Sequence, residues 1–342
     1  MTTTKKSLTR VGIIGFGKRV KTFYSNILKK LNDEFYLAGF TKKTDIDASS
    51  ISEEHDLPYY NDIKSLLNQE LDIIIVSVPA ESINQVLTSI SNFKGVVLID
   101  TLISFNTEEF GLRSFAIEQW PFLPIEQFKK QLISSKVFGG TVFAENDTRT
   151  FEYHSISQLK SYFDKSEQIS NISNSPNIIG GKDCWSIGTV NFASGKGFLY
   201  KFSYFSKKSK FRPQQIKVYL ENGGIITGCF EEKGNDYEIM KAFTESQNCP
   251  ISIKRSSQEI SNKETSFHSG NNFFELDYIS CETPEKTIKW VNRFKGLGFN
   301  DQEISIASIF TEAQRELSNK DSSLISTKSS FEDYFISRTL SQ

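Results

Sequence analysis

Two glycines, Gly15 and Gly17, constrain the fold of this chain more than any other feature of its sequence. They follow the apolar run Val11–Ile14 and precede apolar residues spaced by three and four, which predict a helix with one buried stripe: Val20, Phe23, Tyr24, Ile27, Leu28 and Leu31. In such a unit the first glycine allows a tight turn, and the second lets the diphosphate of a dinucleotide approach the backbone. The sequence therefore predicts a dinucleotide-binding turn formed by Gly15, Phe16, Gly17, Lys18, Arg19 and Val20. The alternative is a plain strand–turn–helix junction, because Val20 stands where the dinucleotide pattern has glycine or alanine.

The rest of the first hundred residues repeats this alternation of strand and helix. Apolar runs that predict strands lie at 35–40, 71–78 and 95–99, and helical patterns lie between them at 63–67 and 83–90. Strands that alternate with helices indicate β-α-β units and a parallel sheet. We therefore expect an α/β fold that begins with a Rossmann doubly wound parallel sheet.

The pattern changes after about residue 136. Runs typical of strands follow one another through short turns, which predicts a large, mostly antiparallel open sheet in a C-terminal α+β domain: 137–144, 184–193, 198–205, 215–220 and 224–230. Helices are expected at 124–134, 153–163, 284–294 and 301–317. We place a dinucleotide-binding domain at 1–118 and a substrate and oligomerisation domain at 119–342, with helix 301–317 able to pack back on the first domain.

Composition excludes several other classes of protein. A net charge of −1 provides no field that would capture a nucleic acid. The four cysteines have no CxxC spacing, and the three histidines lie far apart, so no metal site is expected. No apolar run approaches the ~20 residues that cross a membrane. With no secretory segment at the N-terminus, we expect a cytoplasmic protein with reduced thiols; a disulfide between two of the cysteines is the alternative.

The end of the second predicted strand indicates which dinucleotide binds. NAD-preferring Rossmann domains place an acidic residue there, which holds the ribose 2′-hydroxyl. This chain has Thr41, Lys42 and Lys43 instead. A hydroxyl and two ammonium groups suit a 2′-phosphate, so we expect NADP(H) to be preferred over NAD(H). The alternative is that both lysines are ordinary solvated turn residues.

Over nearly its whole length the sequence resembles the glucose–fructose oxidoreductase/inositol dehydrogenase family, often written Gfo/Idh/MocA. The likeness lies in the turn Val11–Val20, the segment Val76–Pro79, the strand Val96–Asp100 and the stretches Glu118–Pro124 and Tyr153–Phe163. The turn after Phe40 is similar to that of the biliverdin reductase and thiazolinyl imine reductase branches. The resemblance implies a Rossmann domain followed by an α/β domain whose open sheet forms a homo-dimer or homo-tetramer.

Two positions depart from the sugar dehydrogenases of that family. The Glu-Lys-Pro motif beside the nicotinamide aligns with Asp100, Thr101 and Leu102, so the lysine is replaced by Thr101. The later G-x-H-x-x-D helix keeps its histidine as His154 and replaces its aspartate with Ser157. The helix that follows the first motif is shortened to 106–115. Biliverdin reductase-like members also lack the sugar-type pair, so hydride transfer remains compatible with these changes.

The resemblance and the residue chemistry together suggest a set of site residues. His154, Tyr153 and Glu118 are candidate proton donors, although a structural histidine, a packed aromatic ring and a solvated acid are the respective alternatives. Beyond the glycine turn and Thr41–Lys43, the cofactor would contact Val78, Pro79, Asp100 and Thr101. Substrate would contact Arg149, Gln119 and Trp120, unless Trp120 belongs to the core. We interpret His55 and His268 as bystanders.

These residues predict an NADP-dependent oxidoreductase that moves hydride to or from a small-molecule carbonyl, imine or conjugated substrate. The alternative is a dinucleotide-binding protein without redox turnover, such as a sensor, a regulator or an inactive subunit. A third class is non-redox use of the nucleotide, as in glycosidases that employ NAD transiently. Fold likeness alone does not choose the substrate.

Overall fold

The computed structural model describes residues 7–43, 47–100, 107–131, 136–145, 152–175, 185–203, 214–221, 225–233, 236–245, 253–255, 273–276, 279–281, 290 and 293–340. The chain divides into two compact units. The first comprises Met1–Gln119 with Ile306–Glu332, and the second comprises Trp120–Ser305 with Asp333–Gln342.

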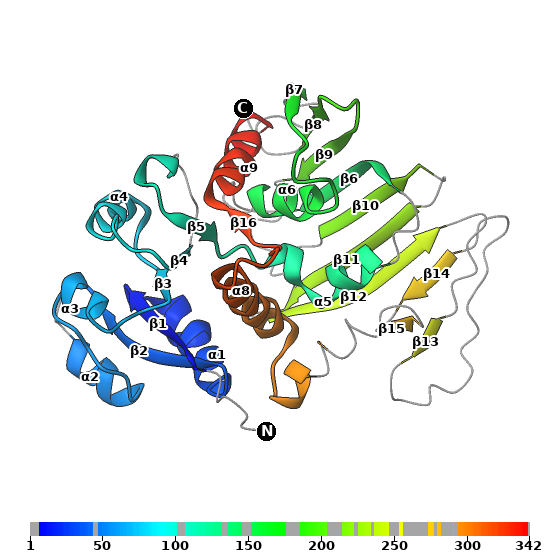
Figure 1. Ribbon diagram of the computed structural model, residues 1–342. Coiled ribbons are helices and arrows are strands. Elements are labelled where there is room, and N and C mark those ends of the chain that lie inside the picture. The colour runs from blue at the N-terminus through cyan, green and yellow to red at the C-terminus, as the bar shows by residue number, and fades with distance from the viewer. Residues whose placement is uncertain are drawn as a thin grey trace. The chain divides into compact units, whose positions relative to one another are not determined.

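The first unit is built on a six-stranded sheet in the order β16-β5-β4-β3-β1-β2 (Figure 1). Its strands are β1 (Thr9–Ile14), β2 (Phe35–Thr41), β3 (Ile73–Val76), β4 (Val96–Ile99), β5 (Arg113–Ala116) and β16 (Ile325–Ser326). The strands from β1 to β5 pair in parallel, and β16 pairs antiparallel with β5. This arrangement confirms the doubly wound parallel sheet. The strand order reverses between β1 and β3, where such sheets bind their ligands.

Helices cover both faces of this sheet. On one face α3 (Ile63–Leu67) and α4 (Ala80–Ser89) pack in a cluster with alternate strand residues such as Ile74 and Val97. On the other face, Phe310 of α8 (Asp301–Leu317) contacts the rings of Tyr24 and Phe35, with ring centroids 6.0 and 6.3 Å apart. The helical segment after β1 contains a π-helical turn, Val20–Tyr24, before α1 (Ser25–Lys30), and α2 spans Ala48–Glu54.

The short helix expected at 106–115 is wrong. In the described part of this segment, residues 107–115, the one helical element is a 3-10 turn at Glu108–Phe110, and Gly111 ends it with a φ of +60°. Residues 113–116 then form β5, because they continue the backbone ladder of β4, with Phe115 opposite Leu98. The pairing available at the edge of the sheet therefore decides the conformation of this segment.

The second unit contains an eight-stranded sheet in the order β14-β12-β11-β10-β6-β9-β8-β7. Its strands are β6 (Val137–Glu145), β7 (Ile169–Ser175), β8 (Trp185–Phe192), β9 (Gly197–Ser203), β10 (Gln214–Leu220), β11 (Ile225–Lys233), β12 (Asp236–Glu245) and β14 (Phe273–Leu276). Only the β6–β9 pair of this sheet is parallel among the described strands, so the mostly antiparallel sheet is confirmed. β13 (Ile253–Arg255) and β15 (Ile279–Cys281) form a separate pair.

Helix α6 (Glu152–Lys160) packs on this second sheet. Ile156 and Leu159 of α6 are fully buried in one cluster with Tyr200 of β9 and Val218 of β10. The unit also contains the 3-10 turn Trp120–Phe122, α5 (Pro124–Gln131), the first residues of α8 and the end of α9 (Thr327–Leu340). The helix expected at 284–294 lies almost entirely outside the described residues.

Candidate functional site

The candidate site lies at the carboxyl edge of the first sheet. Backbone hydrogen bonds continue past the strand ends: Gly15 N donates to Thr41 O at 2.7 Å, Ser77 N to Ile14 O at 2.8 Å, and Asp100 N to Val76 O at 2.8 Å. The residues directly after β1, β3 and β4 are therefore aligned with the end of β2. This is the edge at which doubly wound sheets bind nucleotides.

Gly15 is required by its conformation and by its neighbour. Its φ is +91°, and a Cβ atom there would lie 2.0 Å from the carbonyl oxygen of Ser77. Any side chain would therefore push β1 and β3 apart exactly where the strand order reverses. The structure thus accounts for the first glycine of the pattern by both backbone conformation and close approach.

Gly17 is open instead. It is exposed, and no heavy atom lies within 4 Å of the position that a Cβ would take. Its φ does not lie in the left-handed region. The fold itself therefore does not require glycine at position 17. An open and unstrained glycine is expected where a bound diphosphate must approach the backbone closely.

The two other apolar residues of the turn are packed. Phe16 is 7% exposed, and its ring lies 4.3 Å from that of Phe40 and 5.2 Å from that of His55. Val20 is fully buried at the start of the π-helical turn. The larger residue at the third position of the pattern is therefore accommodated.

A buried carboxylate, Asp100, lies at the end of β4. Its Oδ1 accepts a 2.6 Å hydrogen bond from the Tyr24 hydroxyl, and its Oδ2 accepts one of 2.9 Å from Ser77 Oγ. Arg19 Nε lies 3.2 Å from Oδ1. Burial and, after it, the negative charge of Asp100 raise the pKa of Tyr24 well above its usual range. The phenol therefore stays protonated and serves as a fixed donor to the carboxylate.

The family resemblance places Asp100 near the cofactor, but no sequence motif assigned Tyr24 to the site. The signal was present but ambiguous, because Tyr24 lies on the stripe of the helix that also holds purely structural residues. The π-helical turn Val20–Tyr24 is the local irregularity, and such turns occur often at functional sites.

The turn after β2 contains an acid that the local sequence did not reveal. Thr41 is buried, Lys43 is exposed, and Lys42 Nζ forms an ion pair with Asp47 just before α2. Only 16% of the Lys42 side chain is exposed, against 48% of Asp47. The expectation of a turn that presents only cations is therefore modified, because a carboxylate contacts one of the two lysines.

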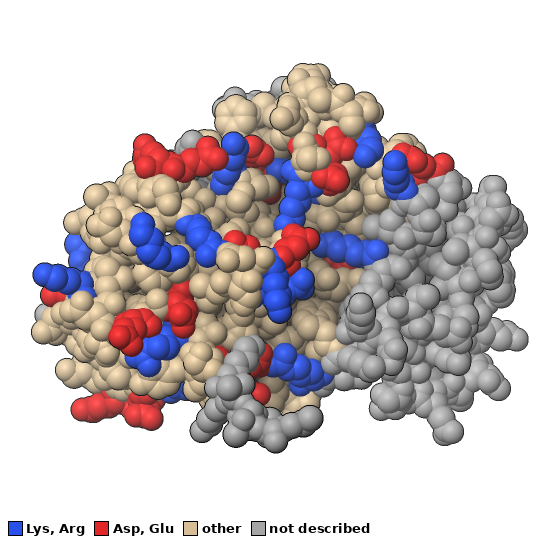
Figure 2. Space-filling model, in the orientation of Figure 1, with Lys and Arg blue, Asp and Glu red and all other residues tan. Residues whose placement is uncertain are grey.

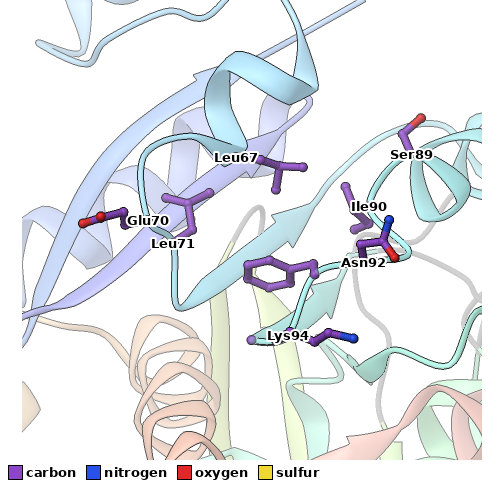
Figure 3. Close-up of a pocket in the computed structure, with 9 residues that line it drawn as sticks. Leu67, Glu70, Leu71, Ser89, Ile90, Asn92 and Lys94 are labelled. Carbon is purple, nitrogen blue, oxygen red and sulfur yellow. The ribbon is translucent and has the colours of Figure 1, made fainter.

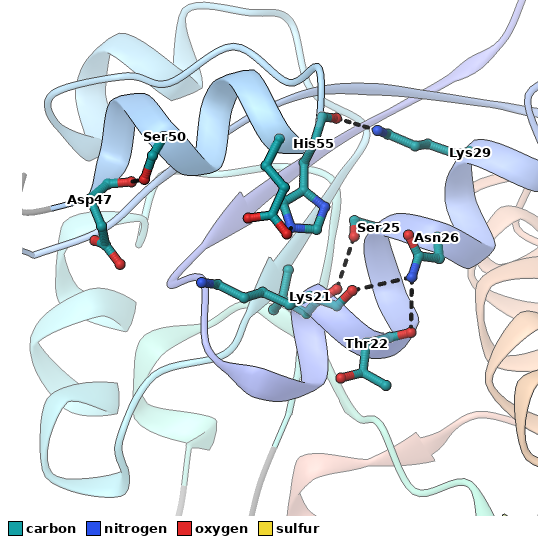
Figure 4. A network of polar contacts seen from close by, with 10 residues as sticks. Lys21, Thr22, Ser25, Asn26, Lys29, Asp47, Ser50 and His55 are labelled. Atoms are coloured by element: carbon teal, nitrogen blue, oxygen red, sulfur yellow. Dashed lines mark hydrogen bonds and ion pairs between the residues drawn. The ribbon is translucent and has the colours of Figure 1, made fainter.

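His55, which we interpreted from the sequence as a bystander, also lies in this region. Figure 4 shows it between α2 and the helical segment that carries Lys21 and Ser25. Its backbone oxygen accepts from Lys29, and its Nε2 lies 3.8 Å from Glu54 Oε1. Its ring supports Phe16 of the glycine turn. His55 is thus a packing neighbour of the turn.

The remaining candidates divide between the two units. Glu118 and Gln119 are buried at the end of β5 in the first unit, so Glu118 is not a solvated loop acid. In the second unit, the ring of His154 lies 3.9 Å from that of Tyr153 and 5.4 Å from that of Trp120. Tyr153 and Trp120 are buried, and His154 is partly exposed. Val78 and Pro79 lie in the turn after β3, whereas Thr101, Arg149 and His268 lie outside the described residues.

A cavity of about 300 Å³ lies at the opposite edge of the first sheet (Figure 3). It is lined by Leu67, Leu71, Ile90, Phe93 and Gly95, with Glu70 and Lys94 among its polar residues. Leu71 and Gly95 precede β3 and β4, so the cavity is at the amino ends of the strands. It is separate from the glycine turn.

Other kinds of site find no support in the described part of the chain. There, no group of three histidine, cysteine or acidic side chains is placed to hold a metal ion. No described helix is long and apolar enough to cross a membrane. On the face shown in Figure 2, basic and acidic side chains of the described residues are interspersed rather than gathered by sign.

No model of a protein family matches the sequence, and no curated protein matches it either. Solved structures do match. A UDP-N-acetylglucosamine 3-dehydrogenase from Acidithiobacillus ferrooxidans superposes with a TM-score of 0.66 at 9% identity, covering 98% of this chain and 96% of that one. An NAD-binding oxidoreductase from Klebsiella pneumoniae gives 0.68 at 11% identity, covering 98% and 96%. A protein from Desulfitobacterium hafniense described as a putative NADPH-dependent oxidoreductase gives 0.67 at 11% identity, covering 98% and 95%. The chain thus has the fold of these dehydrogenases and oxidoreductases over nearly its full length.

Proposed function

We propose that this protein is an oxidoreductase that binds NADP(H) in preference to NAD(H) and moves hydride to or from a small-molecule carbonyl, imine or conjugated substrate. The observation that carries the proposal is the glycine turn. Gly15 is fixed against Ser77 at the point where the strand order reverses, while Gly17 is open to solvent. That combination suits a bound diphosphate. The fold shared with known oxidoreductases supports the redox part of the proposal.

The preference for NADP(H) rests on Thr41, Lys42 and Lys43. The 2′-phosphate of the cofactor would lie beyond the end of β2, where Lys43 is exposed and Lys42 is held by Asp47. Asp47 works against the preference, since its charge repels a phosphate and its oxygens can accept from a ribose hydroxyl. We therefore propose that the balance between Lys42 and Asp47 sets the strength of the preference.

The redox proposal is tested by two measurements on the intact chain. Fluorescence titration with NADPH and NADH measures the two affinities. A screen for NADPH oxidation against aldehydes, ketones, cyclic imines and bilins measures turnover. Tighter binding of NADPH together with oxidation by one substrate class supports the proposal, and equal affinity for both cofactors refutes the preference.

Binding without turnover is the second candidate. The packing of His154 against the rings of Tyr153 and Trp120 favours this candidate. A histidine held among aromatic rings can serve the packing of the fold without transferring a proton. NADPH binding with no oxidation by any of these substrate classes would select this candidate.

We also propose that the protein forms a homo-oligomer. The supporting observation is Leu199, which is 39% exposed on β9 between the buried Phe198 and Tyr200. Light scattering of the intact protein and of Leu199→Glu tests it.

A further inference from the structure

Arg19 directs its guanidinium toward the ends of β4 and β5. Nε lies 3.0 Å from the Tyr24 hydroxyl oxygen and 3.2 Å from Asp100 Oδ1, and Nη2 donates to Gln119 Oε1 at 3.3 Å. Asp100 follows β4, and Gln119 lies beyond the end of β5. The backbone of Arg19 therefore belongs to the glycine turn after β1, and its guanidinium lies at the ends of β4 and β5.

These contacts fix the orientation of the guanidinium, and part of the Arg19 side chain is exposed. A guanidinium carries five N–H donors in one plane. The three contacts described above involve Nε and Nη2, and 40% of the Arg19 side chain is exposed to solvent. A cation that only balanced Asp100 could be buried with it, since Asp100 is 2% exposed. Arg19 instead combines a rigid anchor with an accessible charge.

The position of this charge relates it to one half of the proposed cofactor. A dinucleotide lies across the carboxyl ends of the strands, with one nucleotide on each side of the point where the strand order reverses. The adenosine ribose belongs beyond β2, beside Thr41 and Lys42. The nicotinamide half then lies on the side of β3, β4 and β5, where Arg19 is anchored. A substrate that exchanges hydride with the nicotinamide must bind on that same side.

We propose that Arg19 is a specificity-determining residue that binds a carboxylate of the substrate. The planar fork of arginine matches the two oxygens of a carboxylate, and a fixed guanidinium loses little side-chain entropy when it binds one. The substrate class is then a 2-oxo acid or a cyclic imine that carries a carboxylate. This inference rests on the proposed oxidoreductase function and adds the charge of its substrate.

The cofactor diphosphate is the other anion that this cation could bind. It would approach the backbone at the exposed Gly17, whereas the anchors of Arg19 draw the guanidinium toward Asp100 and Gln119. The two sources of anion make different predictions. Loss of a diphosphate contact weakens NADPH binding itself, and loss of a carboxylate contact spares NADPH and weakens only the acid.

The experiment uses the full chain loaded with NADPH. Glyoxylate, phenylpyruvate and a cyclic imine carboxylate serve as probes, each paired with its methyl ester or carboxamide. Binding is followed by the fluorescence of NADPH and turnover by its oxidation. The variants are Arg19→Gln and Arg19→Lys, which keeps a charge beside Asp100 if the first variant fails to fold. Lys94→Gln is the control, because it removes an exposed charge at the opposite edge of the sheet.

We expect the unmodified protein to favour at least one acid over its neutral partner by tenfold or more. Arg19→Gln should abolish that ratio, Arg19→Lys should reduce it, and Lys94→Gln should preserve it, with NADPH affinity within threefold throughout. The inference is overturned if the unmodified protein does not distinguish acids from esters, or if Arg19→Gln keeps the ratio. It is also overturned if the main effect of the Arg19 variants is on NADPH affinity. Failure of the unmodified protein to bind any dinucleotide would instead refute the proposed function.

Discussion

The hydroxyl of Tyr24 donates a 2.6 Å hydrogen bond to Oδ1 of Asp100, and both side chains are buried. Tyr24 comes from the helical segment after β1, and Asp100 from the end of β4. The bond therefore links two elements that are 76 residues apart in the sequence. It also places a protonated phenol in the interior, with consequences for stability at high pH.

The first prediction is that Tyr24 makes the protein lose stability in alkali. Its pKa is raised in the folded state, chiefly by burial and next by the charge of Asp100, so the folded protein holds a proton that the unfolded chain releases near about pH 10. Protonated Tyr24 contributes fully to the free energy of unfolding below about pH 10, and this contribution is lost as the pH rises further. Tyr24→Phe should show a shallower decline between pH 9 and 11 in urea unfolding. At pH 8 it should be less stable by about 1–3 kcal/mol, because Asp100 loses a donor.

Tyr36→Phe is the matched control, since Tyr36 is 44% exposed. Its stability in urea unfolding should match that of the unmodified protein at pH 8 and between pH 9 and 11. Tyr162, whose pKa burial also raises, keeps part of the alkaline decline in the Tyr24 variant. Parallel curves for Tyr24→Phe and the unmodified protein would contradict the prediction.

The second prediction separates the two glycines of the turn. Gly15→Ala should destabilise the fold by about 2 kcal/mol or more, because alanine is disfavoured at φ +91° and its Cβ would collide with Ser77 O. Gly17→Val should leave the folded protein intact by circular dichroism and abolish NADPH binding, because the branched side chain fills the space of the diphosphate. Normal NADPH binding by folded Gly17→Val would exclude this turn as the phosphate site.

The third prediction concerns cofactor choice. Asp47→Ala should increase the ratio of NADPH to NADH affinity by about fivefold, as expected for removal of one partly exposed charge that opposes a phosphate. Replacing Lys42 and Lys43 with alanine should remove the preference and leave NADH binding nearly unchanged. Lys94→Ala, at the amino edge of the sheet, is the matched control. The idea is wrong if Asp47→Ala shifts the ratio toward NADH.

The fourth prediction assigns the proton donor, provided that a substrate is found. His154→Asn should lower turnover by roughly 10²–10⁴-fold, the range for loss of a general acid, with NADPH affinity almost unchanged. If Tyr153 is the donor, Tyr153→Phe is the damaging change instead. A decrease of less than about threefold in both variants would mean that the proton comes from Glu118, from solvent or from the substrate.

The repeating elements of the fold could be predicted from the sequence because their patterns are local. The apolar run at 71–78 contains β3 (Ile73–Val76), and the helical pattern at 63–67 coincides with α3 (Ile63–Leu67). One of the expected short turns joins β8 to β9, and its Gly195 has a φ of +85°. The sequence did not predict β5 or β16, because each is short and is defined by its pairing with a distant strand.

The candidate site was less predictable for the same reason. Gly15 and Gly17 stand in a recognisable local pattern, whereas the ion pair of Lys42 with Asp47 depends on how the chain returns after β2. The cluster of Asp100, Tyr24, Ser77 and Arg19 gathers residues from three separate turns and one helix. Residue spacing in a single sequence does not predict a contact between residues so far apart in the chain.

The first unit is completed by residues 306–332, which are synthesised well after its other residues. Phe310 covers the rings of Tyr24 and Phe35, and β16 closes the free edge of β5, yet both come from residues 306–332. A ribosome must therefore synthesise residues 306–332 before this sheet is protected. Until then the nascent unit presents an aromatic surface and an unpaired strand edge, which are the features that molecular chaperones bind and that lead incomplete chains to aggregate. Messages cut short before this region should therefore yield products that the cell degrades rather than a free-standing nucleotide-binding domain.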